Sequence, residues 1–216
     1  MRKLILLLSV LAAPLSAGYT YYFNYDFTTF PPSGITVNGS YTFGGPGMGG
    51  PASLIGTGRM PSDGTSDYEV RTEAPGVSCG DHYLRASPDA YYDGYTATGS
   101  FYVVRHCGST VWIYKRVGGV LTLLTQASTE PVGATTVRSV IRGDLLRVFI
   151  NDRYVTGVID SSLPTGAPGF GTSASGISSI QALRFGALDR VAPPAVNASS
   201  IRTYVTPNRL ELSMPA

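Results

Sequence analysis

One loop gathers several side chains that are suited to binding a sugar. Segment 87–99, SPDAYYDGYTATG, contains three tyrosines and two aspartates: Asp89, Tyr91, Tyr92, Asp93 and Tyr95. Aromatic rings stack on the apolar faces of sugar rings, and carboxylates accept hydrogen bonds from sugar hydroxyl groups. The loop has thirteen residues, more than a hairpin connection usually needs, and loops of this length often have a function. We expect these five side chains to form the edge of a carbohydrate-binding surface, the alternative being ordinary loop packing.

A second aromatic pair lies in segment 110–117, TVWIYKRV. Because side chains alternate between the two faces of a strand, Trp112 and Tyr114 share one face while Val111 and Ile113 share the other. If the aliphatic face is in the core, the aromatic face becomes a platform for a ligand. Tryptophan and tyrosine also fill sandwich cores, so both interpretations remain open.

Carboxylates with a spacing of interest for hydrolysis occur in segment 67–73, DYEVRTE. Asp67, Glu69 and Glu73 share one strand face with Arg71. Carboxylates two residues apart on a strand are about 6.5 to 7 Å apart, which overlaps the spacing found in inverting glycosidases. Arg71, however, would keep both of its neighbours ionised, whereas a general acid must hold its proton. We interpret the row as a solvated, charge-balanced face and keep catalysis by these carboxylates as the alternative.

Two short segments have the oxygen-rich composition that calcium prefers. Asp63 and Asp67 bracket three small residues, and Asp89 and Asp93 bracket three residues of the tyrosine loop. Neither matches the twelve-residue calcium loop, and the same residue types dominate ordinary turns. We interpret both segments as turns, with Asp63 and Asp67 as the alternative calcium ligands, and we expect no other cofactor.

The two cysteines are predicted to form a disulfide. If HYLRAS and FYVVRH pair as antiparallel neighbours on either side of the tyrosine loop, His82 faces His106. Cys79 and Cys107 then come within about one residue pair of facing each other, which in an oxidising compartment indicates a disulfide. A zinc site with the two histidines is the alternative, but His106 and Cys107 are adjacent and must point to opposite faces of their strand.

Strands are the elements that must position all of these residues. The run 137–160, VRSVIRGDLLRVFINDRYVTGVID, predicts three strands joined by tight turns at Gly143-Asp144 and Asn151-Asp152. Turn signals recur throughout a chain with 26 Gly and 15 Pro, and there is scarcely a stretch with a helical period. The pattern predicts an all-β fold, an antiparallel two-sheet sandwich of the jelly-roll type.

This meander, together with the GAPGFG sequence at 166–171, resembles the closing half of concanavalin-like and laminin-G-like jelly-roll domains. The resemblance continues upstream and covers residues 19–189. It implies a concanavalin-like jelly roll, a fold shared by lectins, glycosidases, adhesion modules and spacers. The E-x-D-x-x-E arrangement of jelly-roll glycosidases is missing from this sequence. We therefore favour a non-catalytic module that binds carbohydrate or mediates adhesion within a larger protein.

The two ends of the chain differ from this domain. Residues 1–17 have a basic start, an apolar run and small residues before Gly18, which predicts a secretory signal peptide and a secreted protein. The apolar run is too short to span a membrane, so we expect no membrane insertion. The sandwich is then expected over 18–190. Residues 191–216 begin as a Pro-rich linker and resemble the entry of a fibronectin-type-III-like module; a partial second module and an extra edge strand are the two interpretations.

The charge balance gives no reason to expect a nucleic-acid partner. The chain has 16 basic and 14 acidic residues, and removal of residues 1–17 takes away two of the basic ones. The remaining net charge is near zero, which gives no electrostatic attraction to nucleic acid or to an anionic membrane surface. The expected partners are carbohydrate or an extracellular protein.

Overall fold

A computed structural model describes most of the central part of the chain. The described residues are 20–25, 33–40, 42–43, 48–49, 51–58, 67–74, 79–129, 135–172, 177–178, 182–188, 202–206 and 209–213. The chain divides into two units, of which Tyr19–Leu188 is the larger, and the other contains Met1–Gly18 and Asp189–Ala216. The predicted signal peptide lies outside the described residues. The described part of the chain contains no helix that is long and apolar enough to cross a membrane.

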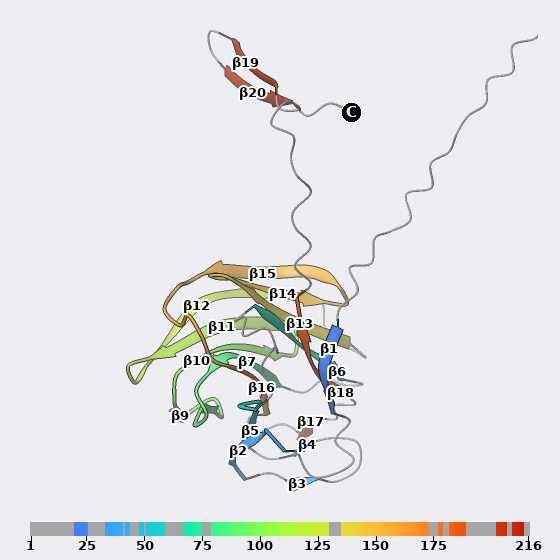
Figure 1. Ribbon diagram of the computed structural model, residues 1–216, viewed down its shortest axis with the longest axis vertical. Helices are drawn as coiled ribbons and strands as arrows, with labels where there is room; N and C mark the ends of the chain where they lie inside the picture. The colour runs from blue at the N-terminus through green and yellow to red at the C-terminus, as the bar shows by residue number, and fades with distance from the viewer. Residues whose placement is uncertain are drawn as a thin grey trace, which may run out of the picture. The chain divides into compact units, whose positions relative to one another are not determined.

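The larger unit is built from two main antiparallel sheets (Figure 1). One has six strands in the order β1 (Thr20–Tyr25), β18 (Ala182–Ala187), β6 (Tyr68–Ala74), β13 (Thr135–Arg142), β14 (Leu145–Ile150) and β15 (Arg153–Ile159). The other has seven, in the order β12 (Val120–Ser128), β11 (Thr110–Val117), β10 (Phe101–Cys107), β7 (Gly80–Ala86), β16 (Ala167–Thr172), β5 (Ala52–Ile55) and β2 (Thr36–Gly39). The predicted all-β antiparallel sandwich is confirmed.

Short strands complete the described structure. A small sheet contains β3 (Thr42–Phe43), β4 (Met48–Gly49) and β17 (Ile177–Ser178), and the tyrosine loop contains a hairpin of β8 (Tyr91–Tyr92) and β9 (Ala97–Thr98). The smaller unit contains one hairpin of β19 (Arg202–Thr206) and β20 (Arg209–Ser213). β20 lies where the C-terminal sequence alternates between apolar and polar residues.

The main core lies between the two large sheets. Each sheet contributes alternate side chains, such as Tyr102 and Val104 from β10 and Leu146 and Val148 from β14. These four side chains are fully buried. Burying a large apolar side chain stabilises a fold by about 1.5 to 3 kcal/mol, so this alternation fixes which face of each strand points inward.

The meander of β13, β14 and β15 is confirmed in its strands and both turns. Asn151 and Asp152 have φ values of 49° and 61°. A two-residue turn of type I′ needs positive φ at both positions, and asparagine and aspartate tolerate it better than most residues. The backbone twist of this turn therefore matches the right-handed twist of β14 and β15.

The pairing of β7 with β10 differs from the expected register by two residues. His82 lies opposite Val104 and Tyr83 lies opposite Val103. A bulge near the end of β7, where Arg85 has a φ of 50°, accounts for one of these two residues. Beyond this bulge Ser87 donates its backbone N–H to the carbonyl oxygen of Ser100, so β7 contains one more residue than β10 over the same stretch. Before the bulge, this shift of two leaves every side chain on the expected face.

The disulfide between Cys79 and Cys107 is present, with a Cα–Cα distance of 4.2 Å. In the observed register the two cysteines are directly opposite each other. His82 and His106 lie on the other face of the same strands, where His82 is hydrogen-bonded to Ser139 and Thr72 at 2.9 Å each. The histidines and cysteines therefore do not converge, and the alternative zinc site does not form.

Candidate functional site

The outward face of the seven-stranded sheet carries the aromatic pair of β11. Val111 and Ile113 are buried in the core between the sheets. Trp112 and Tyr114 therefore point to the other side, where both remain partly exposed. The aliphatic face of β11 therefore lies in the core, and the aromatic face points outward.

The tyrosine loop covers part of this outward face and creates a second apolar cluster. Its buried members are Ile55, Tyr83, Ala86, Ala90, Tyr92, Phe101, Val103 and Ala167. The ring of Tyr92 lies 6.4 Å from that of Phe101 and 5.9 Å from that of Tyr114, measured between centroids. This cluster explains why both faces of β10 are equally apolar: one faces the main core and the other faces the loop.

Asp93 shapes the tip of the loop. Its carboxylate accepts hydrogen bonds from the backbone N–H groups of Tyr95 at 2.8 Å and Thr96 at 2.6 Å, and from the Tyr91 hydroxyl at 3.1 Å. Partial burial raises the pKa of Asp93, but these hydrogen bonds outweigh burial and lower the pKa below its ordinary value. The turn held by the ionised carboxylate leaves the side chain of Tyr95 94% exposed.

Arg105 on β10 lies beside the loop and is held by Asp81 on β7. Arg105 Nε and Nη2 donate to the two carboxylate oxygens of Asp81 at 2.8 and 2.6 Å. Burial raises the pKa of Asp81, and the Arg105 guanidinium opposes that rise. Burial lowers the pKa of Arg105, but its contact with Asp81 outweighs burial and raises it. The pair is a fixed, bidentate ion pair.

The flat face of the same guanidinium lies on the ring of Tyr92, with Cζ 4.1 Å from the ring centroid. Gly94 is close to the other end of the group. A Cβ atom added at Gly94 would lie 2.7 Å from Arg105 Nη1, and the φ of this glycine is 104°. A side chain at position 94 would therefore both strain the backbone and displace the guanidinium.

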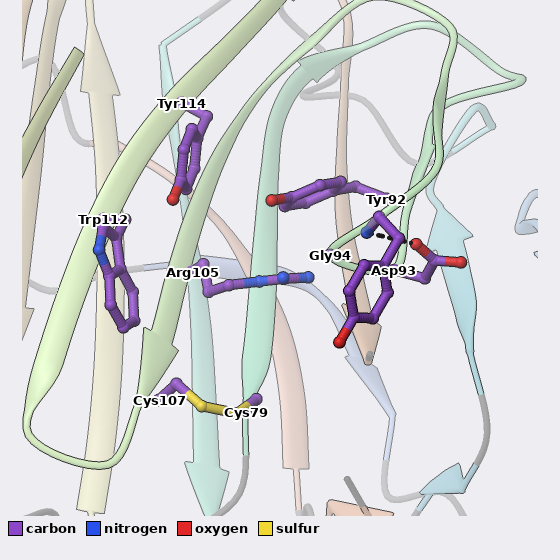
Figure 2. Close-up of a pocket in the computed structure, with 9 residues that line it drawn as sticks. Cys79, Tyr92, Asp93, Gly94, Arg105, Cys107, Trp112 and Tyr114 are labelled. Atoms are coloured by element: carbon purple, nitrogen blue, oxygen red, sulfur yellow. Dashed lines mark hydrogen bonds between the residues drawn. A yellow bond between two sulfur atoms is a disulfide. The ribbon is translucent and has the colours of Figure 1, made fainter. Parts of the chain in front are cut away.

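These residues line an open pocket of about 340 Å³ on the outward face of the sheet (Figure 2). Its lining consists of Cys79, Tyr92, Asp93, Gly94, Tyr95, Arg105, Cys107, Trp112 and Tyr114. Figure 2 shows Arg105 between Trp112 on one side and Gly94 on the other, with the disulfide at one end. Aromatic walls around a few fixed polar groups are typical of ligand pockets.

The pocket brings together the two aromatic groups that the sequence placed far apart. Tyr92, Asp93 and Tyr95 come from the loop, and Trp112 and Tyr114 come from β11. Asp89 and Tyr91 are not among the lining residues. Asp89 accepts a hydrogen bond from the Ser87 hydroxyl at 2.7 Å, and Tyr91 donates to Asp93. These two residues support the loop from outside the pocket.

Arg105 and Asp81 are not among the site residues predicted from the sequence. The expected register placed Asp81 opposite Cys107, and only the observed register places it opposite Arg105. A search for opposite charges on facing strand positions would have favoured the correct register, because such pairs stabilise neighbouring strands.

The carboxylates of segment 67–73 lie elsewhere, on or next to β6 of the six-stranded sheet. Their face is not solvated as expected, since the Glu69 side chain is 0% exposed and lies 3.5 Å from Arg138. Glu73 is paired with Arg184. The reason is that β6 is a central strand, so that arginines on β13 and β18 lie directly beside it. Each glutamate has an ionic partner, which is unsuited to a general acid.

Of the two calcium candidates, the structure describes Asp67. Asp63 lies outside the described residues. Asp67 accepts a hydrogen bond from the backbone N–H of Gly143 at 2.8 Å and lies 3.9 Å from the Arg85 guanidinium. Across the described ranges no group of three or more His, Cys, Asp or Glu side chains is placed to hold a metal ion.

Comparison of the fold with solved structures gives several similar domains, whereas no protein-family model and no curated protein sequence matches. A protein of unknown function with a galectin-like fold from Bacillus subtilis is 10% identical, with a TM-score of 0.53 over 78% of this chain and 98% of that chain. The exoplasmic/lumenal domain of VIP36, bound to Ca2+ and Man3GlcNAc, is 13% identical, with a TM-score of 0.52 over 74% and 86%. The carbohydrate-binding module CBM66 from Bacillus subtilis is 17% identical, with a TM-score of 0.50 over 72% and 93%. The larger unit thus has the jelly-roll fold of galectin-like and lectin-like domains, consistent with a concanavalin-like sandwich.

Proposed function

We propose that the larger unit is a non-catalytic carbohydrate-binding module and that the sugar binds in the aromatic pocket. One observation carries this proposal: four aromatic side chains from two separate elements converge around a fixed arginine. Tyr92 and Tyr95 come from the loop, and Trp112 and Tyr114 come from β11. A sugar ring has apolar faces and a polar rim, and this combination of rings and hydrogen-bonding groups complements both.

Arg105 supplies the central hydrogen-bond donor. Its Nε and Nη2 atoms are engaged by Asp81, while Nη1 has no hydrogen-bond partner among the described residues. Since Asp81 and Tyr92 hold the guanidinium in place, binding a ligand costs little further side-chain entropy. Nη1 can then donate to a sugar hydroxyl from a fixed position.

Two of the solved structures that share the fold support the proposal. One is described as a carbohydrate-binding module and another as a Man3GlcNAc-bound domain. Because this fold also serves other functions, the proposal rests mainly on the pocket, and the similarity to these two domains gives further support.

Glycan-array screening of the larger unit, followed by calorimetry on any bound glycan, tests the proposal. Trp112→Ala should weaken binding about tenfold, the loss expected when one stacked ring is removed. Tyr154→Ala is the matched control, because Tyr154 is also an exposed aromatic side chain but lies on β15 of the other sheet. Binding that Trp112→Ala leaves unchanged would place the ligand outside the pocket.

The absence of catalysis is part of the proposal and is tested separately. Hydrolysis of a glycan by the wild-type protein that disappears in Glu73→Gln would favour the alternative, a hydrolase that uses the carboxylates of segment 67–73. We expect Glu73→Gln to leave glycan binding unchanged, because Glu73 is paired with Arg184 on the six-stranded sheet.

We also propose that the protein is secreted, from the sequence of residues 1–17. Expression of the full chain in a secreting host and sequencing of the N-terminus of the product should locate cleavage near Gly18. Retention of an intact Met1 in a cytoplasmic fraction would contradict secretion.

A further inference from the structure

Two carboxylates lie at the pocket, Asp93 in its lining and Asp81 behind Arg105. Arg105 is the single cation among the described residues that line the pocket, and the carboxylate of Asp81 lies within 2.8 Å of its guanidinium. Asp81 is almost completely buried, at 1% exposure, so water screens this pairing poorly. The arginine therefore acts in the pocket as an oriented hydrogen-bond donor whose charge is largely cancelled.

Asp93 is a second carboxylate, and it forms no ion pair within the part of the chain that the structure describes. It lines the pocket, and its hydrogen bonds come from two backbone N–H groups and a tyrosine hydroxyl, all of them neutral donors. These bonds favour the ionised form but do not neutralise its charge. An anionic group entering the pocket would meet this negative charge.

Other cations near the pocket are already engaged. On β11, Lys115 donates to the Asp160 carboxylate at 2.6 Å and to Ser162 at 2.8 Å. Arg116 donates to the carbonyl oxygen of Gly99 and is not among the lining residues. Arg116 keeps its positive charge, but it lies beyond Tyr114 along the strand, while Asp93 is in the lining itself.

We infer that the pocket selects neutral glycans, and that Asp93 is a specificity-determining residue that disfavours glycans carrying carboxylate or sulfate groups. Asp81 contributes by cancelling the charge that would otherwise attract an acidic sugar. This inference rests on the proposed function of the same pocket. It follows the general rule that specificity needs a repulsive element against the wrong ligand as well as contacts to the right one.

Matched pairs of soluble polysaccharides test the inference, in affinity electrophoresis or biolayer interferometry with the full-length secreted protein. The pairs are hydroxyethyl cellulose with carboxymethyl cellulose, dextran with dextran sulfate, and methyl-esterified with de-esterified homogalacturonan. In any pair that binds, we expect the neutral member to bind about three- to tenfold more tightly, as expected for one like charge at short range in a partly solvated site. Raising the salt concentration to about 0.5 M should reduce this preference, because the ions screen the charge of Asp93.

Asp93→Asn should reduce the difference in affinity between the neutral and the acidic member of a pair. Asparagine keeps a carbonyl oxygen for the loop hydrogen bonds but removes the charge. Asp89→Asn is the matched control: it removes the same charge from the same loop outside the pocket lining, and it should leave the preference unchanged. Equal or tighter binding of the acidic member, lost in Trp112→Ala, would overturn the inference and leave the proposed function standing. Failure of the protein to bind any member of any pair, or any glycan on the array, would overturn both.

Discussion

Arg105 and Asp81 show how one buried ion pair positions a binding group. Their geometry is bidentate, and the ring of Tyr92 covers the guanidinium. A buried pair of this kind contributes little net stability over an apolar pair of the same size, because both charges lose their hydration. Removing one partner is far more costly, since the other charge remains buried alone. Fixing a donor in the pocket is a better explanation of the pair than stability.

Asp81→Asn should therefore lower the free energy of unfolding by about 3 kcal/mol, the cost of leaving the Arg105 charge without its partner. Urea denaturation at pH 7 measures this change. Asp152→Asn serves as the control, because Asp152 also pairs with an arginine but is 63% exposed. This variant should lower the free energy of unfolding by no more than about 0.5 kcal/mol. Equal losses for the two variants would contradict the role given to the buried pair.

The two histidines between the sheets make the fold sensitive to acid. Burial is the main cause that lowers the pKa of both, and Arg105 also acts on His106, whose pKa falls to about 4. Because the folded pKa is below the unfolded value of about 6.5, the fold favours neutral imidazole. The contribution of the neutral histidines to the free energy of unfolding is fully present above pH 6.5 and is lost as the pH falls from 6.5 towards 4.

Between pH 7 and pH 5 the free energy of unfolding should fall by about 2 kcal/mol from His106 alone, and His82 adds a loss of the same sign. Urea denaturation across this range measures the slope, and His106→Gln should reduce it. A free energy of unfolding that stays constant from pH 7 to pH 5 would show that the histidines are not buried as neutral groups.

At the scale of elements, alternation and turn chemistry were sufficient to predict the meander but not the pairing of β7 with β10. Gly143-Asp144 and Asn151-Asp152 mark turns of only two residues, which fix the register of their strands directly. Strands β7 and β10 are joined by fourteen residues, and a bulge at Arg85 adds one more residue on one side. Alternation cannot distinguish two registers that differ by two residues, because such a shift leaves every face unchanged. For this reason the sequence singled out aromatic residues that line the candidate pocket but not the ion pair beside them.

The disulfide joins these same two strands and closes a loop with a sequence separation of 28 residues. In the chain-entropy account, a crosslink of this span stabilises the fold by roughly 3 to 4 kcal/mol by restricting the unfolded chain. Cys79→Ser with Cys107→Ser should lower the midpoint of urea unfolding accordingly. Mass spectrometry that finds two free thiols in the natively secreted protein would contradict the bond itself.

At the scale of the whole molecule, the larger unit has one main core and one smaller cluster. The main core joins the two sheets, whereas the smaller cluster joins the tyrosine loop to the outward face of one sheet. The sequence predicted the sandwich because its strands alternate clearly. It did not predict the smaller cluster, since Phe101 and Val103 are as apolar as Tyr102 and Val104 and nothing in the pattern separates a covered outer face from an inner one.

Because the loop has its own cluster, we expect it to open while the sandwich remains folded. Backbone amides of Tyr92 and Thr96 should therefore exchange with solvent deuterium faster than those of β10, with an opening free energy below that of global unfolding. Hydrogen-exchange mass spectrometry measures both, and equal protection in loop and strand would show a single cooperative unit.

If the loop opens first, warming should abolish glycan binding before the sandwich unfolds. The heated protein would keep its circular dichroism spectrum but would no longer bind a glycan. Conversely, a bound glycan should close the loop and slow its exchange, so that at saturating concentration a ligand can be recognised by the segment it protects.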